Sequence, residues 1–128
     1  MKNSLILIRG LPGSGKSTFA KSLVEGRNLY AHVEADDYFM IDGVYNFQAR
    51  ELPMAHRQCQ HITSRLLSFG YSVVVSNTFT QKWEMETYIH MAAEFSAELF
   101  IITMNGNFGS IHNVPDEAIA RMKNRWED

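Results

Sequence analysis

The sequence predicts an α/β fold, a three-layer sandwich in which helices cover both faces of a mainly parallel sheet of about four to five strands. Short, continuously apolar runs at residues 4–8, 73–75 and 99–103 have the pattern of strands buried on both faces. Stretches with helical spacing of apolar residues alternate with these runs. Alternating strands and helices build parallel sheets, so the carboxyl ends of the strands meet at one edge, where such folds bind ligands.

Four further stretches are expected to form helices, because their apolar residues recur three and four positions apart. They cover residues 19–24, 52–69, 85–92 and 115–126. Gly26 and Gly70 follow the first two as stop signals, and Pro115 suits the first turn of the last. Asp42-Gly43 predicts a turn between two irregular stretches. Four aromatic residues at helical positions are expected in the core: Trp83, Tyr88, Phe95 and Trp126.

The length and composition of the chain indicate one folded unit. Its 128 residues fit a single domain over residues 1–128 and leave no room for a second. The net charge is -2, so no overall positive field attracts nucleic acid or a membrane, and a nucleic-acid partner would need a local basic patch. No apolar run approaches the roughly 18 residues that cross a bilayer. With Cys59 expected as a buried thiol, we predict a soluble cytoplasmic protein without a membrane partner.

The strongest motif is a glycine-rich loop at residues 10–17, between a predicted strand and a predicted helix. It reads Gly-Leu-Pro-Gly-Ser-Gly-Lys-Ser and matches the P-loop pattern G-x-x-x-x-G-K-[ST]. Glycines let successive backbone N–H groups face phosphate oxygens, and the positive end of the helix dipole adds to the attraction. A turn that merely caps a helix is the alternative. The residues expected to bind the nucleotide are Gly10, Gly13, Ser14, Gly15, Lys16, Ser17 and Thr18.

Three side chains of this loop have distinct expected roles. Lys16 would bridge the β- and γ-phosphates of ATP, or alternatively GTP, and so counts among the catalytic candidates. The Ser17 hydroxyl is the expected protein ligand of Mg²⁺. Thr18 can donate a hydrogen bond to the α-phosphate. The sequence therefore predicts a site for a nucleotide and a magnesium ion.

Two adjacent carboxylates are the other candidates for catalysis. Asp36 and Asp37 follow a weaker strand candidate at residues 31–35, at the edge of the sheet where the loop is expected. Phosphoryl transfer needs a base near the acceptor hydroxyl, and Asp36 is the candidate. The alternative is that either aspartate caps the next turn. Asn77 stands where many P-loop enzymes carry a metal-holding acid, and its amide could accept a hydrogen bond from a metal-bound water.

Together these residues resemble a known family, the small P-loop ATP-binding proteins related to the kinase domain of phage polynucleotide kinase. The likeness covers nearly the whole chain. It rests on residues 10–18, Asp36-Asp37-Tyr38, residues 43–56, Asn77-Thr78, Trp83-Glu84 and residues 112–115. The resemblance implies that Asp36 activates a 5′-hydroxyl and that Asp37 supports it.

The chain departs from this family at three charged positions. Residues 105–110 contain no arginine, although the family usually has basic residues in this lid. Phe39 stands where the polynucleotide kinase has an arginine, and Asn77 where it has an aspartate. Three basic residues of the last expected helix could supply the missing charge, or could simply form a solvated helix end: Arg121, Lys123 and Arg125.

These observations leave three functions open. The leading hypothesis is an ATP-dependent phosphotransferase of the polynucleotide-kinase type, whose acceptor is a nucleic-acid 5′-hydroxyl or a nucleoside-like hydroxyl. The second is a nucleotide-binding regulatory module with little catalysis, which presents different lids to a protein partner. The third is a kinase for a small metabolite, which the nearly neutral charge suits. Residues 105–113, rich in glycine and asparagine, are expected to be mobile without ligand.

Overall fold

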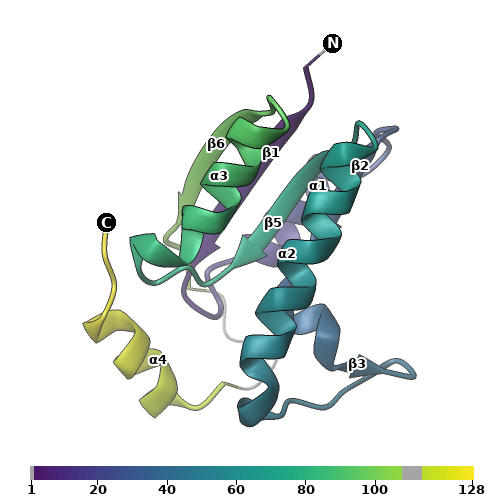
Figure 1. Cartoon of the computed structure of the whole chain (residues 1–128). Helices are drawn as coiled ribbons and strands as arrows, with labels where there is room; N and C mark the ends of the chain where they lie inside the picture. The colour runs from purple at the N-terminus through teal and green to yellow at the C-terminus, as the bar shows by residue number, and fades with distance from the viewer. Residues whose placement is uncertain (1, 108–113) are drawn as a thin grey trace.

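The computed structural model describes residues 2–107 and 114–128 and contains a four-stranded parallel sheet in the order β2-β5-β1-β6. Its strands are β1 (Ser4–Gly10), β2 (Tyr30–Val33), β5 (Ser72–Asn77) and β6 (Glu98–Met104). The register pairs Leu5 of β1 with Val73 on one side and with Leu99 on the other. All four carboxyl ends point to the same end of the molecule (Figure 1). The predicted α/β fold with a parallel sheet is confirmed, with four strands in this sheet.

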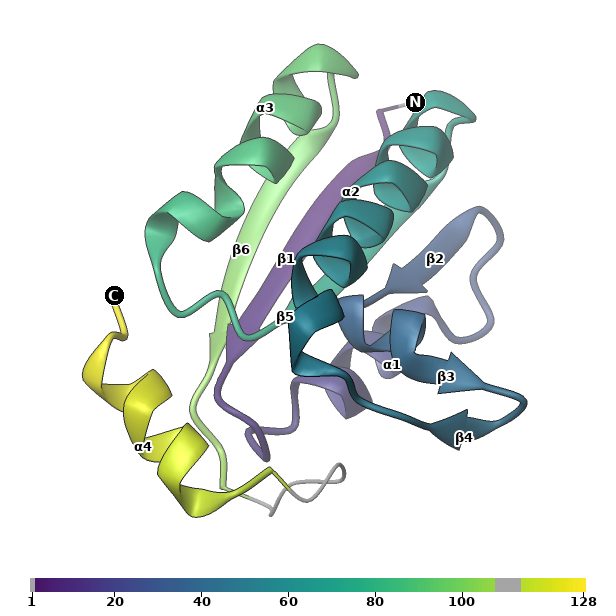
Figure 2. The same ribbon diagram turned by 60° about the horizontal axis from the view of Figure 1, so that its bottom comes forward.

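Three helices cover the two faces of the sheet. One face packs against α1 (Lys16–Val24), and the other against α2 (Leu52–Ser68) and α3 (Glu86–Glu94), which lie along the same side (Figure 2). Successive side chains of a strand point to opposite faces. Accordingly, Ile8 packs with Ala20 of α1, whereas Leu5 and Leu7 belong to the larger cluster beneath α2 and α3. The predicted three layers are therefore present.

The longest helix, α2, follows the predicted pattern closely. Its buried residues recur every fourth position, at Ala55, Cys59, Thr63 and Leu67. Cys59 is 2% exposed, as expected of a buried thiol. None of the helices in the described part of the chain combines the length and the hydrophobicity that a membrane span requires.

The fourth helix, α4 (Asp116–Asn124), lies beyond the carboxyl ends of the strands rather than on either face of the sheet (Figures 1 and 2). It has no fully buried residue. Its apolar side chains Ile119 and Met122, and Trp126 after it, are half-buried. This position brings α4 next to the loop that follows β1.

A short hairpin connects β2 to α2. Its strands are β3 (Met40–Ile41) and β4 (Val44–Tyr45). Asp42 and Gly43 between them have φ angles of 50° and 79°, which a two-residue hairpin turn requires. The turn is confirmed, but the flanking stretches are paired strands rather than irregular. Three 3₁₀ helices complete the elements: η1 (Ala35–Phe39), η2 (Ala49–Glu51) and η3 (Lys82–Met85).

Three local predictions are wrong. Residues 99–103, expected to form a strand buried on both faces, belong to the edge strand β6, in which Phe100 and Ile101 are each 44% exposed. The strand expected at residues 31–35 ends at Val33, because the Ala35 N–H leaves the strand ladder and donates to Asn77 Oδ1 at 2.8 Å. Trp83, expected in the core, is 65% exposed, since it lies on η3 rather than on the inner face of α3. Tyr88, which does lie on that inner face, is 1% exposed as predicted.

A buried arginine fixes the end of the chain to the sheet. Arg9 of β1 is 3% exposed and donates to the carbonyl oxygens of Phe79, at 2.8 and 3.0 Å, and Thr80, at 3.3 Å. It also donates to the carbonyl of Glu127. Its guanidinium lies 4.3 Å from the ring centroid of Trp126. These contacts position α4 over the loop that follows Arg9.

We expect Arg9→Leu to lower the free energy of unfolding by about 2 to 4 kcal/mol, because it leaves several buried carbonyls without donors. Urea unfolding at neutral pH measures the loss. The matched control is Arg27→Leu, since Arg27 is exposed and its guanidinium lies 5.4 Å from the Tyr30 ring. It should cost less than about 1 kcal/mol. Equal losses in the two variants would contradict the anchoring role of Arg9.

Candidate nucleotide-binding site

The glycine-rich loop leaves β1 and turns tightly into α1. The Ser14 N–H donates to Leu11 O at 3.0 Å, and Gly13 and Gly15 have φ angles of 83° and 89°, which favour glycine. Gly15 is the N-terminal cap of α1, so the unpaired N–H groups of the first helical turn face the loop. The fold therefore builds an anion-binding cradle at the predicted position.

Gly10 is required by a close approach rather than by its backbone angles. A Cβ atom at this position would lie 2.3 Å from Ser14 Oγ and 3.0 Å from the Met104 carbonyl oxygen. The end of β1 thus packs directly against both the loop and the end of β6. Ser14 is 1% exposed, and its hydroxyl has no hydrogen-bond partner among the described residues.

We expect Gly10→Ala to weaken ATP binding by about tenfold, because rotation of the Ser14 hydroxyl leaves the close contacts with Ser14 Cβ, at 3.1 Å, and the Met104 carbonyl, at 3.0 Å, which only a shift of the loop or of β6 relieves. The measurement is the dissociation constant of ATP, alongside the thermal midpoint of unfolding. Gly26→Ala is the control: its φ of 71° also disfavours alanine, but a Cβ there has no neighbour within 4 Å. That variant should lose some stability and keep its ATP affinity. Unchanged affinity in Gly10→Ala would contradict the packing argument.

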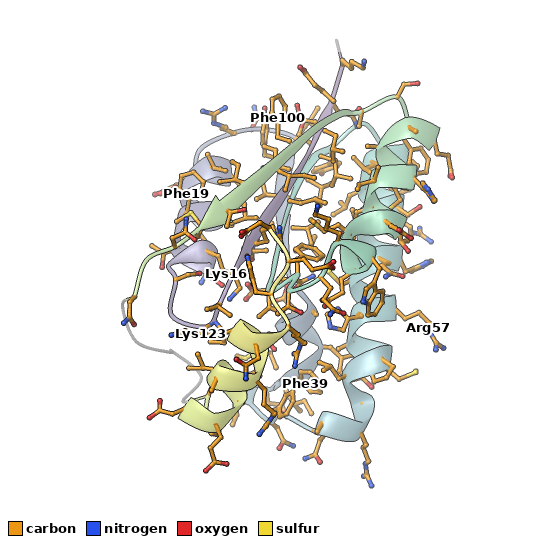
Figure 3. The ribbon with its side chains drawn as sticks, turned by 90° about the vertical axis from the view of Figure 1, so that its left-hand side faces the viewer. Lys16, Phe19, Phe39, Arg57, Phe100 and Lys123 are labelled. Carbon is orange, nitrogen blue, oxygen red and sulfur yellow. The ribbon has the colours of Figure 1, made fainter. Side chains whose placement is uncertain are left out.

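A cavity of about 490 Å³ opens at the carboxyl ends of the strands, between the loop and α4. Of the predicted nucleotide-binding residues, five line it: Gly13, Gly15, Lys16, Ser17 and Thr18. Gly10 lies behind the loop, and Ser14 lines a second cavity of about 310 Å³ together with Lys123. Figure 3 shows Lys16 at the start of α1 and Lys123 on α4, both at this end of the molecule.

The charges around Lys16 are mixed. Burial lowers the pKa of Lys16, and the negative charges of Glu34 and Asp36 oppose this shift. Glu34 and Asp36 line the same cavity. The site thus holds an ammonium group and two carboxylates in a confined space, as phosphoryl transfer would require.

Glu34, which the sequence argument missed, lies at the centre of a hydrogen-bond network. Its Oε2 accepts from Ser17 Oγ at 2.8 Å and from Ser76 Oγ at 2.9 Å, and His32 Nε2 lies 3.5 Å away. Burial alone would raise the pKa of Glu34, but contacts with His32, Ser17 and Ser76 outweigh it and lower the pKa to about 2. The available signal was a carboxylate directly after a strand, at the edge where the loop lies.

The two predicted aspartates have different positions. Asp36 lines the cavity, and its Oδ1 accepts a hydrogen bond from the Tyr45 hydroxyl at 3.1 Å. Burial and the nearby Asp36 raise the pKa of Tyr45, which keeps its hydroxyl protonated. Asp37 does not line the cavity; its Oδ2 accepts from the Glu34 N–H at 3.2 Å and caps η1. For Asp37 the capping alternative holds, and its support of Asp36 stays a prediction.

Asn77 has a structural role beside the site. It is 6% exposed, its Oδ1 accepts from the Ala35 N–H, and its Nδ2 lies 3.7 Å from Cys59 Sγ. The amide therefore holds the start of η1 against β5 and α2. This arrangement fixes where Asp36 stands.

Of the three basic candidates on or near α4, only one lines the main cavity. Arg125 does, and its Nε donates to Thr80 Oγ1 at 3.2 Å. Lys123 faces the second cavity, and Arg121 is exposed and lines neither. Most of the predicted lid at residues 105–113 lies outside the described residues. The structure describes residues 105–107 of this lid.

Apolar and aromatic side chains also line the cavity, beside polar ones such as His56 and Glu84. Tyr45, Phe47 and Leu52 line it from the hairpin and the start of α2, and Met122 lines it from α4. Phe47 is 47% exposed, and its ring packs edge-on against Phe39, with centroids 5.0 Å apart. Sequence reasoning did not assign these residues to the site, because no local pattern shows that the hairpin and α4 line the same cavity.

The chain is similar to one protein family and to several known proteins. Residues 5–107 match the family described as an AAA domain, AAA_33. The sequence is 31% identical over 133 residues to NEDD4-binding protein 2 of Homo sapiens, covering 96% of this chain but only 8% of that protein. The structure is similar to a chain of the Pnkp1/Rnl/Hen1 RNA repair complex (TM-score 0.74, 18% identity, 97% of this chain and 44% of that chain). It is also similar to a gluconokinase from Sinorhizobium meliloti 1021 (TM-score 0.66, 18% identity, 98% of this chain and 75% of that chain).

The chain therefore belongs to the AAA_33 family, and its fold is that of the P-loop kinases.

Proposed function

We propose that this domain binds ATP, with GTP as the alternative, and transfers the γ-phosphate to a hydroxyl group. The observation that carries the proposal is that one cavity is lined both by the loop residues Lys16 and Ser17 and by the carboxylate of Asp36. Phosphoryl transfer depends mainly on positioned phosphates, neutralising charge and a base near the acceptor. The described residues offer each of these in one place.

The loop would hold the nucleotide through backbone N–H groups, the Lys16 ammonium and the Thr18 hydroxyl. Mg²⁺ would be bound by Ser17 Oγ and the phosphates, and it would neutralise charge on the β- and γ-phosphates. The contacts of Ser17 fit this ion: its hydroxyl proton is donated to Glu34, so the oxygen lone pairs remain available. Ser17 is thus compatible with the role predicted for it.

In the transfer step, Asp36 would accept the proton of the acceptor hydroxyl while the hydroxyl oxygen forms a bond to the γ-phosphorus. The bond from the γ-phosphorus to the bridging oxygen breaks, and the electron pair leaves with ADP. The Tyr45 hydroxyl, hydrogen-bonded to Asp36, would orient the carboxylate. Arg125, which lines the same cavity, is the basic residue placed to offset negative charge.

The acceptor side of the cavity supports a nucleoside-like hydroxyl acceptor or a nucleic-acid 5′ end. Tyr45 and Phe47 offer aromatic surface against which a base can stack. The similar chain in an RNA repair complex is consistent with this choice.

The test follows label from γ-labelled ATP with Mg²⁺ into a panel of acceptors: a 5′-hydroxyl dinucleotide, a longer 5′-hydroxyl oligonucleotide, a nucleoside and gluconate. We expect label in the nucleoside-containing acceptors. Affinity for the longer acceptor that falls steeply with salt would indicate polynucleotide contacts. Label in gluconate alone would support a metabolite kinase instead.

A nucleotide-binding module with little catalysis is the second candidate. Phe39, at the position where the related kinase has an arginine, is 2% exposed in the core and brings no charge to the cavity. The amide of Asn77 is likewise neutral. If ATP binds without transfer and a protein partner is captured only in one nucleotide state, this second function is the correct one. NEDD4-binding protein 2, by its name, binds another protein, which motivates the comparison.

A further inference from the structure

Glu34 stands where β2 ends, beside the end of β5, and lines the nucleotide cavity. Hydroxyl groups from two different elements converge on one of its carboxylate oxygens. Ser17 Oγ of α1 lies 2.8 Å and Ser76 Oγ of β5 lies 2.9 Å from Glu34 Oε2. Ser76 Oγ also lies 2.6 Å from His32 Nε2, so the network holds the carboxylate from both neighbouring strands.

The direction of the Ser17 hydrogen bond follows from its partners. A carboxylate can only accept, so the single hydroxyl proton of Ser17 points toward Glu34. The lone pairs of Ser17 Oγ then face away from Glu34. A serine that binds Mg²⁺ needs this arrangement, because the metal takes a lone pair and not the proton.

The other polar groups near the end of β5 are neutral or engaged elsewhere. Ser76 and Asn77 carry no charge, and Asn77 Oδ1 accepts the Ala35 N–H. Glu84, a further carboxylate lining the cavity, accepts from Thr80 Oγ1 and from the Gln81 N–H, where it caps η3. Glu34 is thus the carboxylate in contact with the predicted metal ligand Ser17.

We propose that Glu34 anchors Mg²⁺ in this site, as the acceptor of the Ser17 hydroxyl proton and of a hydrogen bond from a metal-bound water, in place of an acid at the end of β5. Carboxylates that orient a metal ligand in this way typically contribute 10- to 100-fold to metal affinity. The inference rests on the proposed function, because it needs a nucleotide and Mg²⁺ in the same cavity. Glu34, directly after β2, would thus supply the negative charge that the neutral Asn77 at the end of β5 does not.

The test measures metal binding directly, with a non-hydrolysable ATP analogue and Mn²⁺ as the spectroscopic probe. Electron paramagnetic resonance gives the affinity of Mn²⁺ for the protein–nucleotide complex, and calorimetry in EDTA gives the affinity for the nucleotide alone. In Glu34→Gln we expect Mn²⁺ affinity to fall by about 10- to 100-fold. Nucleotide affinity in EDTA should stay the same or rise, since a negative charge near the phosphates is removed. The control Asp42→Asn removes the same charge from the exposed hairpin turn and should change neither value.

A double variant distinguishes a specific loss of metal binding from a loss of folding. Because Ser76 Oγ lies 2.9 Å from Glu34 Oε2, a carboxylate at residue 76 can take the place of the Glu34 carboxylate once the Glu34 side chain is removed. Glu34→Ala combined with Ser76→Asp should therefore bind Mn²⁺ more tightly than Glu34→Ala alone. Circular dichroism verifies that each variant is folded.

The outcomes separate the two proposals. Unchanged Mn²⁺ affinity in Glu34→Gln, or no gain over Glu34→Ala in a folded double variant, overturns the role of Glu34 and leaves nucleotide binding intact. A fall in nucleotide affinity in EDTA overturns it as well, because Glu34 would then support the loop itself. If the unmodified protein fails to bind the analogue with or without metal, the proposed function is wrong instead.

Discussion

Asp36→Asn is expected to lower the rate of phosphoryl transfer by about 10²- to 10⁴-fold, the usual contribution of a general base. The substitution keeps the size of the side chain and its capacity to accept from Tyr45, whose hydroxyl lies 3.1 Å from Asp36 Oδ1. It removes the ability to take a proton from the acceptor. ATP affinity should change little, because the loop residues are untouched. Initial rates of label transfer at saturating ATP measure the effect.

Asp42→Asn provides the control for the loss of one negative charge. Asp42 sits in the hairpin turn at a φ of 50°, a conformation that asparagine accepts readily. Its transfer rate should match that of the unmodified protein. If Asp36→Asn transfers phosphate at the same rate as this control, Asp36 is not the base.

Lys16→Ala is expected to weaken ATP binding by about 10- to 100-fold, because charge-assisted hydrogen bonds to phosphate contribute about 1.5 to 3 kcal/mol. Lys16 lies at the N-terminus of α1 and lines the cavity. Transfer should fall further than binding, since charge on the γ-phosphate grows as the bond breaks. Calorimetric titration and the labelled assay together distinguish the two losses.

Lys21→Ala is the matched variant, because Lys21 is an exposed lysine on the same helix and lines neither cavity. Both variants lose one positive charge and gain an alanine with good helix propensity. A similar ATP affinity in Lys16→Ala and Lys21→Ala would show that nucleotide does not bind at the loop.

The main elements of the fold could be predicted because their signals are local. The apolar runs of β1, β5 and β6 and the four-residue stripe of α2 lie within single segments. Where pairing between distant segments decides the structure, prediction failed. The strand expected at residues 31–35 ends early because Ala35 binds a side chain 42 residues away, on β5. Arg9 reads as the polar end of a strand, yet it is buried by partners from the loop after β5 and from the end of the chain.

The sequence predicted the glycine-rich loop and Asp36 as parts of the candidate site, but not Glu34 or Phe47, which also line the cavity. The motif at residues 10–17 fixes the tight turn and the start of α1 through backbone geometry. Glu34, by contrast, acquires its role only when β2 pairs with β5 and brings Ser76 alongside. At the end of β5 the sequence shows only the neutral Asn77 where many P-loop enzymes carry an acid, and no local pattern singles out Glu34. The aromatic lining from Phe47 likewise depends on how the hairpin packs on Phe39.

A single-turnover experiment shows whether this domain transfers the γ-phosphate of ATP to a hydroxyl group. Protein in excess over γ-labelled ATP is mixed with Mg²⁺ and a 5′-hydroxyl dinucleotide, and the reaction is quenched over time. Because the protein is in excess, a single transfer per ATP molecule is detected even when repeated turnover is slow. We expect label to move from ATP to the dinucleotide 5′ end, at a rate that Asp36→Asn lowers by about 10²- to 10⁴-fold. Label that remains in bound ATP, or appears only as inorganic phosphate, would contradict the proposed transfer.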